Sequence, residues 1–287
     1  MHISPWKLLN EKNLRPRKSM GQNFLIDPST AEMIIRKSGV GGKDAVVEIG
    51  AGLGALTLPL AAAAKVVYAV EKDSAVAGVL DAELKLRGVD NVVLSNQDIF
   101  DVDLASIAAK ENRNLMIFGN LPYYISSQVL IRLISVHSCI QQADLMFQKE
   151  VAQRLIAGPG TKAYGRLSVL LQYYADIRRT ATVNAHLFWP APKVDSEVLQ
   201  FNFKQEFAPA VCDPDLFAAV VKAAFSRRRK TLLNAMSSSE LKIRREDLLT
   251  VFNASGIDPG NRAESLSVNQ FVQLTNTING YQEDILS

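Results

Sequence analysis

The chain has 287 residues, of which 48% are hydrophobic, and its formal net charge at pH 7 is +3. This length and apolar content suffice for one large domain or two smaller ones, and they argue against a disordered chain. The two cysteines, Cys139 and Cys212, and the three histidines show no ligand spacing, so we expect a reducing compartment, no disulfide framework and no metal site. Because no apolar run could span a bilayer and the N-terminus lacks a secretory pattern, we expect a soluble, cytoplasmic protein.

Positive charge is concentrated in two segments. Residues 1–20 hold five basic residues against one acid, and residues 227–245 hold seven basic residues against Glu240 alone. Such clusters are typical of surfaces that bind a polyanion, although a solvated helix face has the same pattern. Charge alone leaves these two interpretations equal.

Helical and strand-like segments alternate from about residue 28. Asp27-Pro28 is a favourable helix start, with Asp as the N-cap and Pro in the first turn. The apolar runs that follow are short and continuous, as in strands buried on both faces, and helical stretches separate them. This order predicts βαβ units around a parallel sheet. The predicted strands are 45–49, 66–70, 92–94, 115–118 and 145–147, and the predicted helices are 55–64, 74–87, 104–110 and 126–137.

The pattern changes after Lys149. Residues 150–156 look helical, 167–177 are an apolar segment of either type, and 194–203 ends in the alternation of an antiparallel strand. From about residue 207 only helices are predicted, at 214–225, 230–236, 245–254 and 268–278. We therefore expect an α/β domain over residues 1–206, with a mostly parallel sheet and one antiparallel strand, and a small all-helical domain over residues 207–287.

A glycine-rich turn, Glu48-Ile49-Gly50-Ala51-Gly52-Leu53-Gly54, follows the first predicted strand and precedes a helix. Glycines there allow a tight turn and a close approach of the backbone to a ligand at a helix N-terminus. Gly50, Gly52 and Ala55 also fit the loose dinucleotide fingerprint, with Glu71 about 20 residues further on. The turn therefore predicts a nucleotide-type cofactor and leaves a nicotinamide-dependent oxidoreductase open.

Two acids follow the next two predicted strands. Glu71 comes directly after 66–70, where a carboxylate can accept hydrogen bonds from both hydroxyls of a ribose. Asp98 comes after 92–94 and suits a cofactor whose adenine amine needs an acceptor, which the dinucleotide pattern does not require. Each acid also has an ordinary interpretation as a surface residue at a strand end.

The segment Asn120-Leu121-Pro122-Tyr123 ends the fourth predicted strand, which in an open parallel sheet places it beside the glycine turn. An exocyclic adenine amine is a poor nucleophile, because its lone pair is conjugated with the ring. The side-chain oxygen of Asn120 and the carbonyl of Leu121, presented by Pro122, can accept its two hydrogens and favour the positively charged transition state. Tyr123 offers a stacking face worth ~1–3 kcal/mol per base. A strand followed by a turn also uses Asn and Pro, but a nicotinamide enzyme has no use for this tetrapeptide, so the segment favours methyl transfer to an adenine amine.

This tetrapeptide resembles the Asn/Asp-Pro-Pro-Tyr/Phe signature of amino-directed nucleic-acid methyltransferases, in the form used by ribosomal RNA adenine dimethyltransferases. The resemblance covers nearly the whole chain, and Gly21-Gln22-Asn23-Phe24-Leu25 is similar to the N-terminal motif of that family. It implies a Rossmann-like methyltransferase fold with a C-terminal helical domain, and S-adenosyl-L-methionine as the cofactor. The cofactor contacts that it implies are Asn23, Leu25, Gly50, Gly52, Glu71, Asp98 and Asn120.

Further stretches resemble the small-subunit (16S) dimethyladenosine transferase branch. Residues 147–155, 162–168 and 188–196 are similar to segments of that branch, in which the position of Phe188 is an aromatic that faces the target base. From the residues alone, Phe188 would be ordinary packing. Residues 226–234 resemble the basic segment that opens the helical domain, which implies phosphate contacts. The implied catalytic residues are Asn120, Leu121, Pro122, Tyr123 and Phe188, and the implied RNA-binding residues are Arg227, Arg228, Arg229 and Lys230.

The resemblance implies N6,N6-dimethylation of two adjacent adenosines near the 3′ end of small-subunit (16S) rRNA during ribosome biogenesis. The partner would be the small subunit, with no membrane contact and a monomeric enzyme, and the target base must leave its stack. Two alternatives stay open: a large-subunit rRNA adenine N6-methyltransferase, and an RNA-binding ribosome-assembly factor with secondary catalysis. Residues 193–196 and 228–230 argue against the first, and the intact Asn120, Glu71 and Asp98 argue against a silent enzyme. The segment before Arg15 has no counterpart that we can assign.

Overall fold

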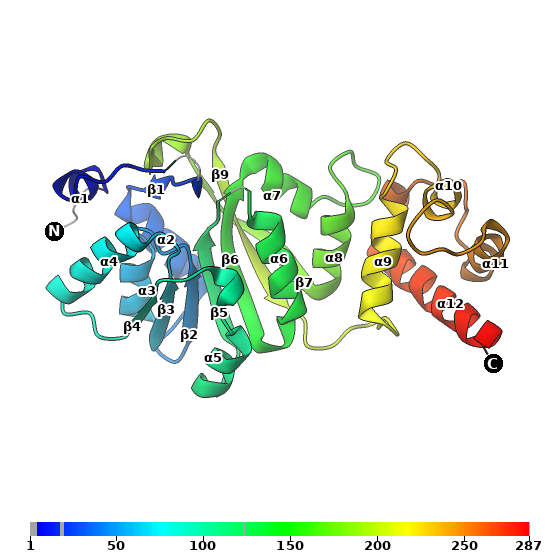
Figure 1. Cartoon of the computed structure of the whole chain (residues 1–287), viewed down its shortest axis with the longest axis horizontal. Coiled ribbons are helices and arrows are strands. Elements are labelled where there is room, and N and C mark those ends of the chain that lie inside the picture. The colour runs from blue at the N-terminus through cyan, green and yellow to red at the C-terminus, as the bar shows by residue number, and fades with distance from the viewer. Residues whose placement is uncertain (1–4, 18–19, 123, 287) are drawn as a thin grey trace. The chain divides into compact units, whose positions relative to one another are not determined.

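The computed structural model describes residues 5–17, 20–122 and 124–286 (Figure 1). The chain forms two compact units, one of residues 1–152 with 176–203 and one of residues 153–175 with 204–287. We call them the sheet unit and the helical unit. This division differs from the one expected at residue 206, because residues 153–175 pack with the helical unit before the chain returns to the sheet.

A seven-stranded sheet forms the centre of the sheet unit (Figure 1). Parallel pairing joins β2 to β3, β3 to β4, β2 to β5 and β5 to β6, whereas β9 runs antiparallel to β6. The expected Rossmann-like sheet, mostly parallel with an antiparallel strand, is therefore confirmed. In order across the sheet the strands are β4 (Val92–Ser95), β3 (Val66–Val70), β2 (Ala45–Ile49), β5 (Leu115–Asn120), β6 (Ile140–Gln148), β9 (Ser196–Phe203) and β7 (Ala175–Val183).

The strand order reverses at β2, which has β3 on one side and β5 on the other. Loops that leave the carboxyl ends of strands at such a reversal diverge and leave a crevice for a ligand. The backbones of β2 and β5 approach closely there: a Cβ atom on Gly119 would lie 2.9 Å from the carbonyl oxygen of Ile49. The glycine turn and the segment around Asn120 therefore lie next to each other, as the sequence predicts.

Helices and one short ribbon complete the sheet unit. Helix α2 begins as predicted, because the Asp27 carboxylate caps it by accepting from the Thr30 N–H at 2.9 Å. The ribbon pairs β1 (Phe24–Leu25) antiparallel with β8 (Phe188–Trp189). The helices that begin in this unit are α1 (Pro5–Glu11), α2 (Pro28–Ser38), α3 (Thr57–Ala63), α4 (Ser74–Leu86), α5 (Leu104–Glu111), α6 (Ser126–Ser135) and α7 (Lys149–Leu155).

The helical unit is held by an aromatic core. Phe217, Phe252 and Phe271 are fully buried, and the ring of Phe225 stacks on Phe271 with their centroids 5.8 Å apart. All the helices predicted after residue 207 are present, and the last is longer than expected. The helices of this unit are α8 (Arg166–Tyr174), α9 (Pro214–Ala224), α10 (Leu232–Met236), α11 (Arg245–Ser255) and α12 (Val268–Leu286).

Four elements were not predicted: α1, β1, β7 and β8. The ambiguous segment 167–177 is helix α8 up to Tyr174 and strand β7 from Ala175. Short 3-10 turns lie at Ile99–Asp101, His137–Cys139, Ala185–Leu187 and Ala263–Ser265. Within the described ranges, no helix is long and apolar enough to cross a membrane.

Candidate functional site

A cavity of about 450 Å³ opens at the carboxyl ends of the central strands of the sheet unit. Its size lies within the range of small-molecule sites, roughly 300–1,000 Å³. The N-terminal segment 20–25 forms one wall, and the loops after β2, β3, β4 and β5 form the others. All the residues that we expected to contact a cofactor line it, namely Asn23, Leu25, Gly50, Gly52, Glu71, Asp98 and Asn120.

Two glycines give the loop after β2 its shape. Gly50 and Gly52 have φ angles of +73° and +56°, in the left-handed region that residues with a side chain seldom adopt. A Cβ atom on Gly50 would meet no atom within 4 Å, whereas a Cβ atom on Gly52 would lie 3.3 Å from the ring of Phe24. The loop therefore exposes its backbone to the cavity at Gly50 and packs under Phe24 at Gly52.

The carboxylate of Glu71 fastens this loop to the end of β3. Its Oε2 accepts a hydrogen bond from the Gly52 N–H at 2.9 Å, and its Oε1 accepts one from the Asp73 N–H at 2.8 Å. Burial raises the pKa of Glu71, and these two backbone N–H groups oppose that rise. Each oxygen keeps a further lone pair, so Glu71 can still accept from a ligand hydroxyl.

Glu48 is a second buried acid at the cavity, and sequence reasoning gave it no role. The side chain is only 2% exposed and lies in β2, whose other residues are apolar. Its Oε2 is buried and has no hydrogen-bond partner in the described part of the chain. Burial raises the pKa of Glu48 to about 8; the nearby hydroxyl of Thr57 opposes this rise, and the charge of Glu71 adds to it. The sequence signal for Glu48 was an acid inside a continuous apolar run. A buried acid without a partner is costly, so its presence there indicates a functional role.

Asp98 is held by a neighbouring lysine. Its Oδ2 accepts from Lys72 Nζ at 2.7 Å, and its Oδ1 accepts from the Phe100 N–H at 3.2 Å. Burial alone would raise the pKa of Asp98, but the hydrogen bonds from Lys72 and Phe100 outweigh it, so the pKa is lowered. Lys72 also lines the cavity and was not among the predicted residues.

Asn120 lies at the end of β5, where its Nδ2 donates to the carbonyl oxygen of Asn23 at 3.0 Å. Asn23 is itself fixed by its side chain, whose Nδ2 donates to the carbonyl oxygen of Gly21 at 3.1 Å. Because a carbonyl oxygen only accepts, the amide nitrogen of Asn120 must face Asn23, and Oδ1 is the end left to accept from a substrate.

The rest of the predicted tetrapeptide is only partly described. Pro122 lines the cavity, and the side chain of Leu121 is buried. Tyr123 lies outside the described residues. Its neighbour Tyr124 lines the cavity and is 59% exposed, so an aromatic face is present there that the sequence reasoning missed.

The structure does not place Phe188 at the cavity with the predicted catalytic residues Asn120 and Pro122. Its side chain is 3% exposed, it packs in the hydrophobic core, and it does not line the cavity. The reason is the β1–β8 ribbon, in which Phe188 pairs with Leu25. In this conformation the ring offers no open face to a base.

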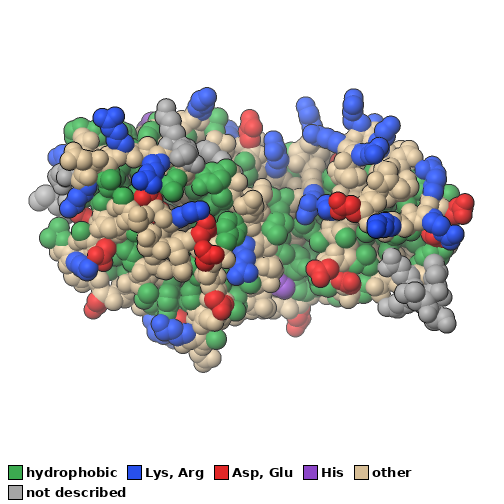
Figure 2. Space-filling model, viewed as in Figure 1, with side chains coloured by type: hydrophobic (Ala, Val, Ile, Leu, Met, Phe, Trp, Pro, Cys, Tyr) green, Lys and Arg blue, Asp and Glu red, His purple; other side chains and the backbone are tan. Residues whose placement is uncertain are grey.

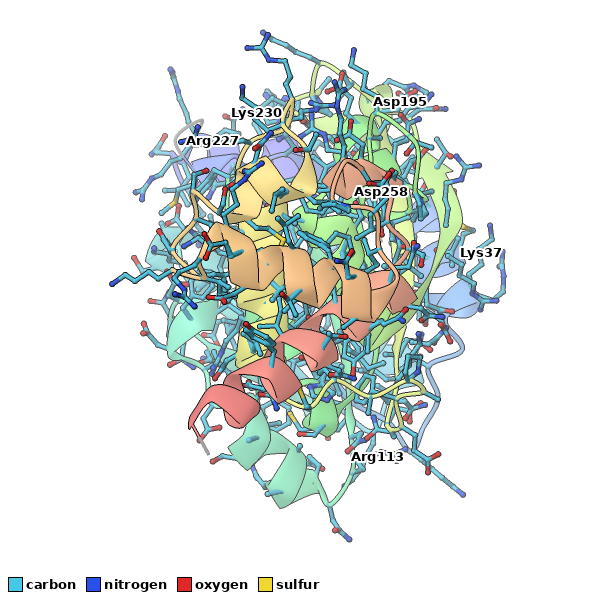
Figure 3. All side chains as sticks on the ribbon, turned by 90° about the vertical axis from the view of Figure 1, so that its right-hand side faces the viewer. Lys37, Arg113, Asp195, Arg227, Lys230 and Asp258 are labelled. Atoms are coloured by element: carbon cyan, nitrogen blue, oxygen red, sulfur yellow. The ribbon has the colours of Figure 1, made fainter. Side chains whose placement is uncertain are left out.

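The predicted RNA-binding residues follow α9 in the helical unit. Arg227, Arg228, Arg229 and Lys230 are all exposed, and Figure 2 shows basic side chains gathered over this part of the unit. Arg227 and Lys230 lie close together beyond the end of α9 (Figure 3). Arg228 donates to the carbonyl oxygen of Lys162 at 2.7 Å, which fixes the turn against the loop before α8. None of the four forms an ion pair within the described residues, so their charges remain available for an anion.

Metal ligands are not gathered anywhere in the described residues, where no group of three His, Cys, Asp or Glu side chains could hold an ion.

Comparison with known proteins identifies the family. The ribosomal RNA adenine dimethylase family matches residues 13–280. The chain is 45% identical to ribosomal RNA small subunit methyltransferase A of Desulforapulum autotrophicum over 275 residues, which cover 96% of each chain. It is 43% identical to the protein of the same name from Magnetococcus marinus over 270 residues, which cover 94% of each chain.

Solved structures agree with this match. A dimethyladenosine transferase from Plasmodium falciparum superposes with a TM-score of 0.78 at 26% identity, covering 90% of this chain and 98% of that one. The 23S rRNA methyltransferase ErmE superposes with a TM-score of 0.68 at 22% identity, covering 90% and 100%, which shows the shared fold alone. The chain belongs to the ribosomal RNA adenine dimethylase family.

Proposed function

We propose that this protein transfers methyl groups from S-adenosyl-L-methionine to N6 of two adjacent adenosines near the 3′ end of small-subunit (16S) rRNA. Each adenosine would receive two methyl groups during ribosome biogenesis, and the enzyme would act as a cytoplasmic monomer on the small subunit. The names of the relatives at 45% and 43% identity support the choice of subunit. The hydrogen bond between Asn120 and Asn23 is the observation that carries the chemistry.

The cavity fits S-adenosyl-L-methionine because the ligand presents donors where the cavity presents acceptors. The buried, unpartnered Oε2 of Glu48 suits the ammonium of the methionine part. Glu71 suits the ribose hydroxyls and Asp98 the adenine amine, while Gly50 leaves room for the ligand against the backbone. When bound, the cofactor supplies a methyl group activated by a positively charged sulfur.

Asn120 orients the target amine. Its Oδ1 would accept one N6 hydrogen and the carbonyl of Leu121 the other. Held in this way, the nitrogen lone pair is drawn out of conjugation with the adenine ring. Positive charge grows on this nitrogen during transfer, and both acceptors therefore bind the transition state more tightly than the ground state. The amine becomes strongly acidic once methylated and loses its proton to solvent, so no strong base is required. Asn23 prevents the Asn120 amide from turning its nitrogen toward the substrate.

The exposed basic segment gives this proposal an RNA-binding surface. Arg227, Arg229 and Lys230 would contact phosphates, which adds affinity without reading sequence. The target base must leave its stack to reach the cavity, and single-stranded loops permit this most easily. Tyr124, exposed beside Pro122, offers a ring on which an unstacked base can rest.

The experiment that tests this function is methyl transfer with mapped products. The protein is given radiolabelled S-adenosyl-L-methionine with unmodified small subunits, large subunits or naked rRNA, and the labelled nucleotides are located. We expect label in two neighbouring adenosines near the 3′ end of the small-subunit RNA. Label in large-subunit RNA would establish the alternative specificity, and the absence of label from all three would leave only an assembly factor.

A further inference from the structure

Helix α1 lies against the cavity, although its residues precede the segment 13–280 that the family matches. Leu8 and Leu9 are buried, at 8% and 1% exposed, whereas Trp6 and Asn10 are exposed. Leu8 is also one of the residues that line the cavity. The helix therefore turns one apolar edge inward, and part of that edge faces the ligand space.

The inner edge of α1 packs on the glycine loop after β2 and on helix α4. Leu8 and Leu9 form a hydrophobic cluster with Phe24, with Leu53 of the glycine loop, and with Val76 and Val79 of α4. Helix α4 begins directly after Glu71 and Asp73, and Figure 1 shows α1 and α4 at the same end of the sheet unit. Through this cluster α1 joins the loop after β2 to helix α4, which follows the loop after β3.

The chain that follows α1 is fastened at the same place. The guanidinium of Arg17 lies 3.5 Å from Asp73 Oδ2, and Gln22 Nε2 donates to the same oxygen at 3.1 Å. The Arg17 N–H donates to Gln22 Oε1 at 2.7 Å. Asp73 is the N-cap of α4, and its own N–H donates to Glu71. Polar contacts therefore hold the N-terminal segment to Asp73, whose backbone N–H contacts the carboxylate proposed for the ribose.

We propose that α1 is a wall of the S-adenosyl-L-methionine site, with Leu8 as a cofactor contact and Leu9 as the anchor of the helix. This inference rests on the proposed function. An apolar wall excludes water from the cavity, which strengthens the polar contacts of Glu48 and Glu71 with the ligand. Holding the glycine loop against α4 also lowers the ordering cost of binding.

The test measures the affinity for S-adenosylhomocysteine by calorimetry in the full chain and in matched alanine variants of α1. We expect Leu8→Ala to weaken binding about tenfold, a change of about 1.4 kcal/mol. Asn10→Ala, an exposed position on the same helix, should bind as the unaltered protein does. Leu8→Met, which conserves volume, should restore the affinity. The melting temperature of each variant shows whether it is folded.

A second measurement uses the position of Trp6. The chain has two tryptophans, and Trp6 is half-exposed on α1, outside the cavity lining. We expect the tryptophan fluorescence to change as S-adenosylhomocysteine is added, with a midpoint at the Kd measured by calorimetry. Trp6→Phe should remove part of that change without altering the affinity.

The outcomes separate this inference from the function on which it rests. Equal affinities in Leu8→Ala and the unaltered protein would overturn the role of α1 and leave the function standing. The role of α1 is also overturned if Leu8→Ala weakens only RNA binding, because α1 would then be an RNA contact. If the unaltered protein does not bind S-adenosylhomocysteine, the proposed function falls and this inference falls with it.

Discussion

The side-chain amide of Asn120 donates a hydrogen bond through Nδ2 to the backbone carbonyl oxygen of Asn23, over 3.0 Å. The two residues are 97 positions apart in the chain, so this contact exists only once the N-terminal segment has folded over the end of β5. It gives Asn120 one amide orientation, in which Oδ1 is left as the end that can accept a hydrogen bond. Under the proposed function, the N-terminal segment would therefore take part in the chemistry as well as in enclosing the cavity.

Replacing Asn120 tests this chemistry. Asn120→Ala removes one of the two acceptors, and loss of a single preorganised group of this kind lowers kcat roughly 100- to 1,000-fold. The measurement is methyl transfer to small subunits at saturating cofactor, with RNA affinity as the control. RNA affinity should stay near normal, because the basic segment lies in the other unit. Full activity in Asn120→Ala would contradict the mechanism.

Asn23→Ala gives a matched test of the orienting contact. It keeps the backbone carbonyl that Asn120 uses but removes the side-chain bond to Gly21 that fixes it. We expect a smaller fall in kcat than in Asn120→Ala, about tenfold, because the acceptor is still present but less firmly oriented. An unchanged kcat with a raised KM for the cofactor would assign Asn23 to cofactor binding alone.

The proposed contact between Asp98 and the adenine amine predicts discrimination against a cofactor analogue. In S-inosylhomocysteine an oxygen replaces this amine, so an acceptor would face the Asp98 carboxylate. Hydrogen bonds to charged groups contribute about 1.5–3 kcal/mol. The unaltered protein should therefore bind S-adenosylhomocysteine roughly 10- to 100-fold more tightly than the analogue. In Asp98→Ala the affinities for S-adenosylhomocysteine and for the analogue, both measured by calorimetry, should become similar. If the variant still discriminates, a residue other than Asp98 contacts the amine.

Much of the fold could be predicted because burial leaves a clear pattern in a parallel sheet. Strands β2 and β5 are covered on both faces, so Ala45–Ile49 and the start of Leu115–Asn120 appear as continuous apolar runs. Strand β7 lies at the edge of the sheet and includes exposed Arg178 and Arg179, so it shows no such run. Among the described side chains of helix α1 only the adjacent Leu8 and Leu9 are buried, so its sequence shows no helical apolar period.

The candidate site was predicted in part for a similar reason. Residues at strand ends, such as Glu71 and Asn120, converge wherever parallel strands share an edge, and the cavity contains them. Contacts from distant segments leave no local signal, which is why Leu8 was missed. Phe188 was expected beside the target base from the family resemblance, but the β1–β8 pairing buries it.

The exposed basic segment predicts a specific change in salt dependence. Each phosphate contact contributes about 0.7–0.9 to the slope of log affinity against log salt concentration. If Arg229 and Lys230 each contact a phosphate, the double variant Arg229→Gln/Lys230→Gln should lower the magnitude of that slope by about 1.4–1.8 in titrations with rRNA. Lys222→Gln is the control, because Lys222 is exposed in the same unit but paired with Glu240. Equal slopes in the double variant and the unaltered protein would show that Arg229 and Lys230 do not contact RNA phosphates.

The buried Glu48 predicts how stability depends on pH in the absence of cofactor. Its pKa rises from 4.5 to about 8 on folding, so the folded protein keeps a proton that the unfolded chain loses. The stabilising contribution of the protonated group is complete below pH 4.5 and disappears as the pH rises through 8. Glu48→Gln carries no such proton, so its melting temperature relative to the unaltered protein should rise between pH 5 and pH 8.

Comparing the two proteins separates Glu48 from the other buried acids with a raised pKa, Glu71 and Asp144, which both proteins retain. Burial also raises the pKa of Asp144, to about 6, but Asp144 is present in both proteins and cancels from the difference. Each pKa unit corresponds to about 1.4 kcal/mol, so the difference in melting temperature should change by several degrees. A difference that is constant from pH 5 to pH 8 would show that Glu48 is already ionised in the folded protein. A saturating ligand that supplies an ammonium should reverse the trend, because it would stabilise the ionised form of Glu48 and disfavour Glu48→Gln.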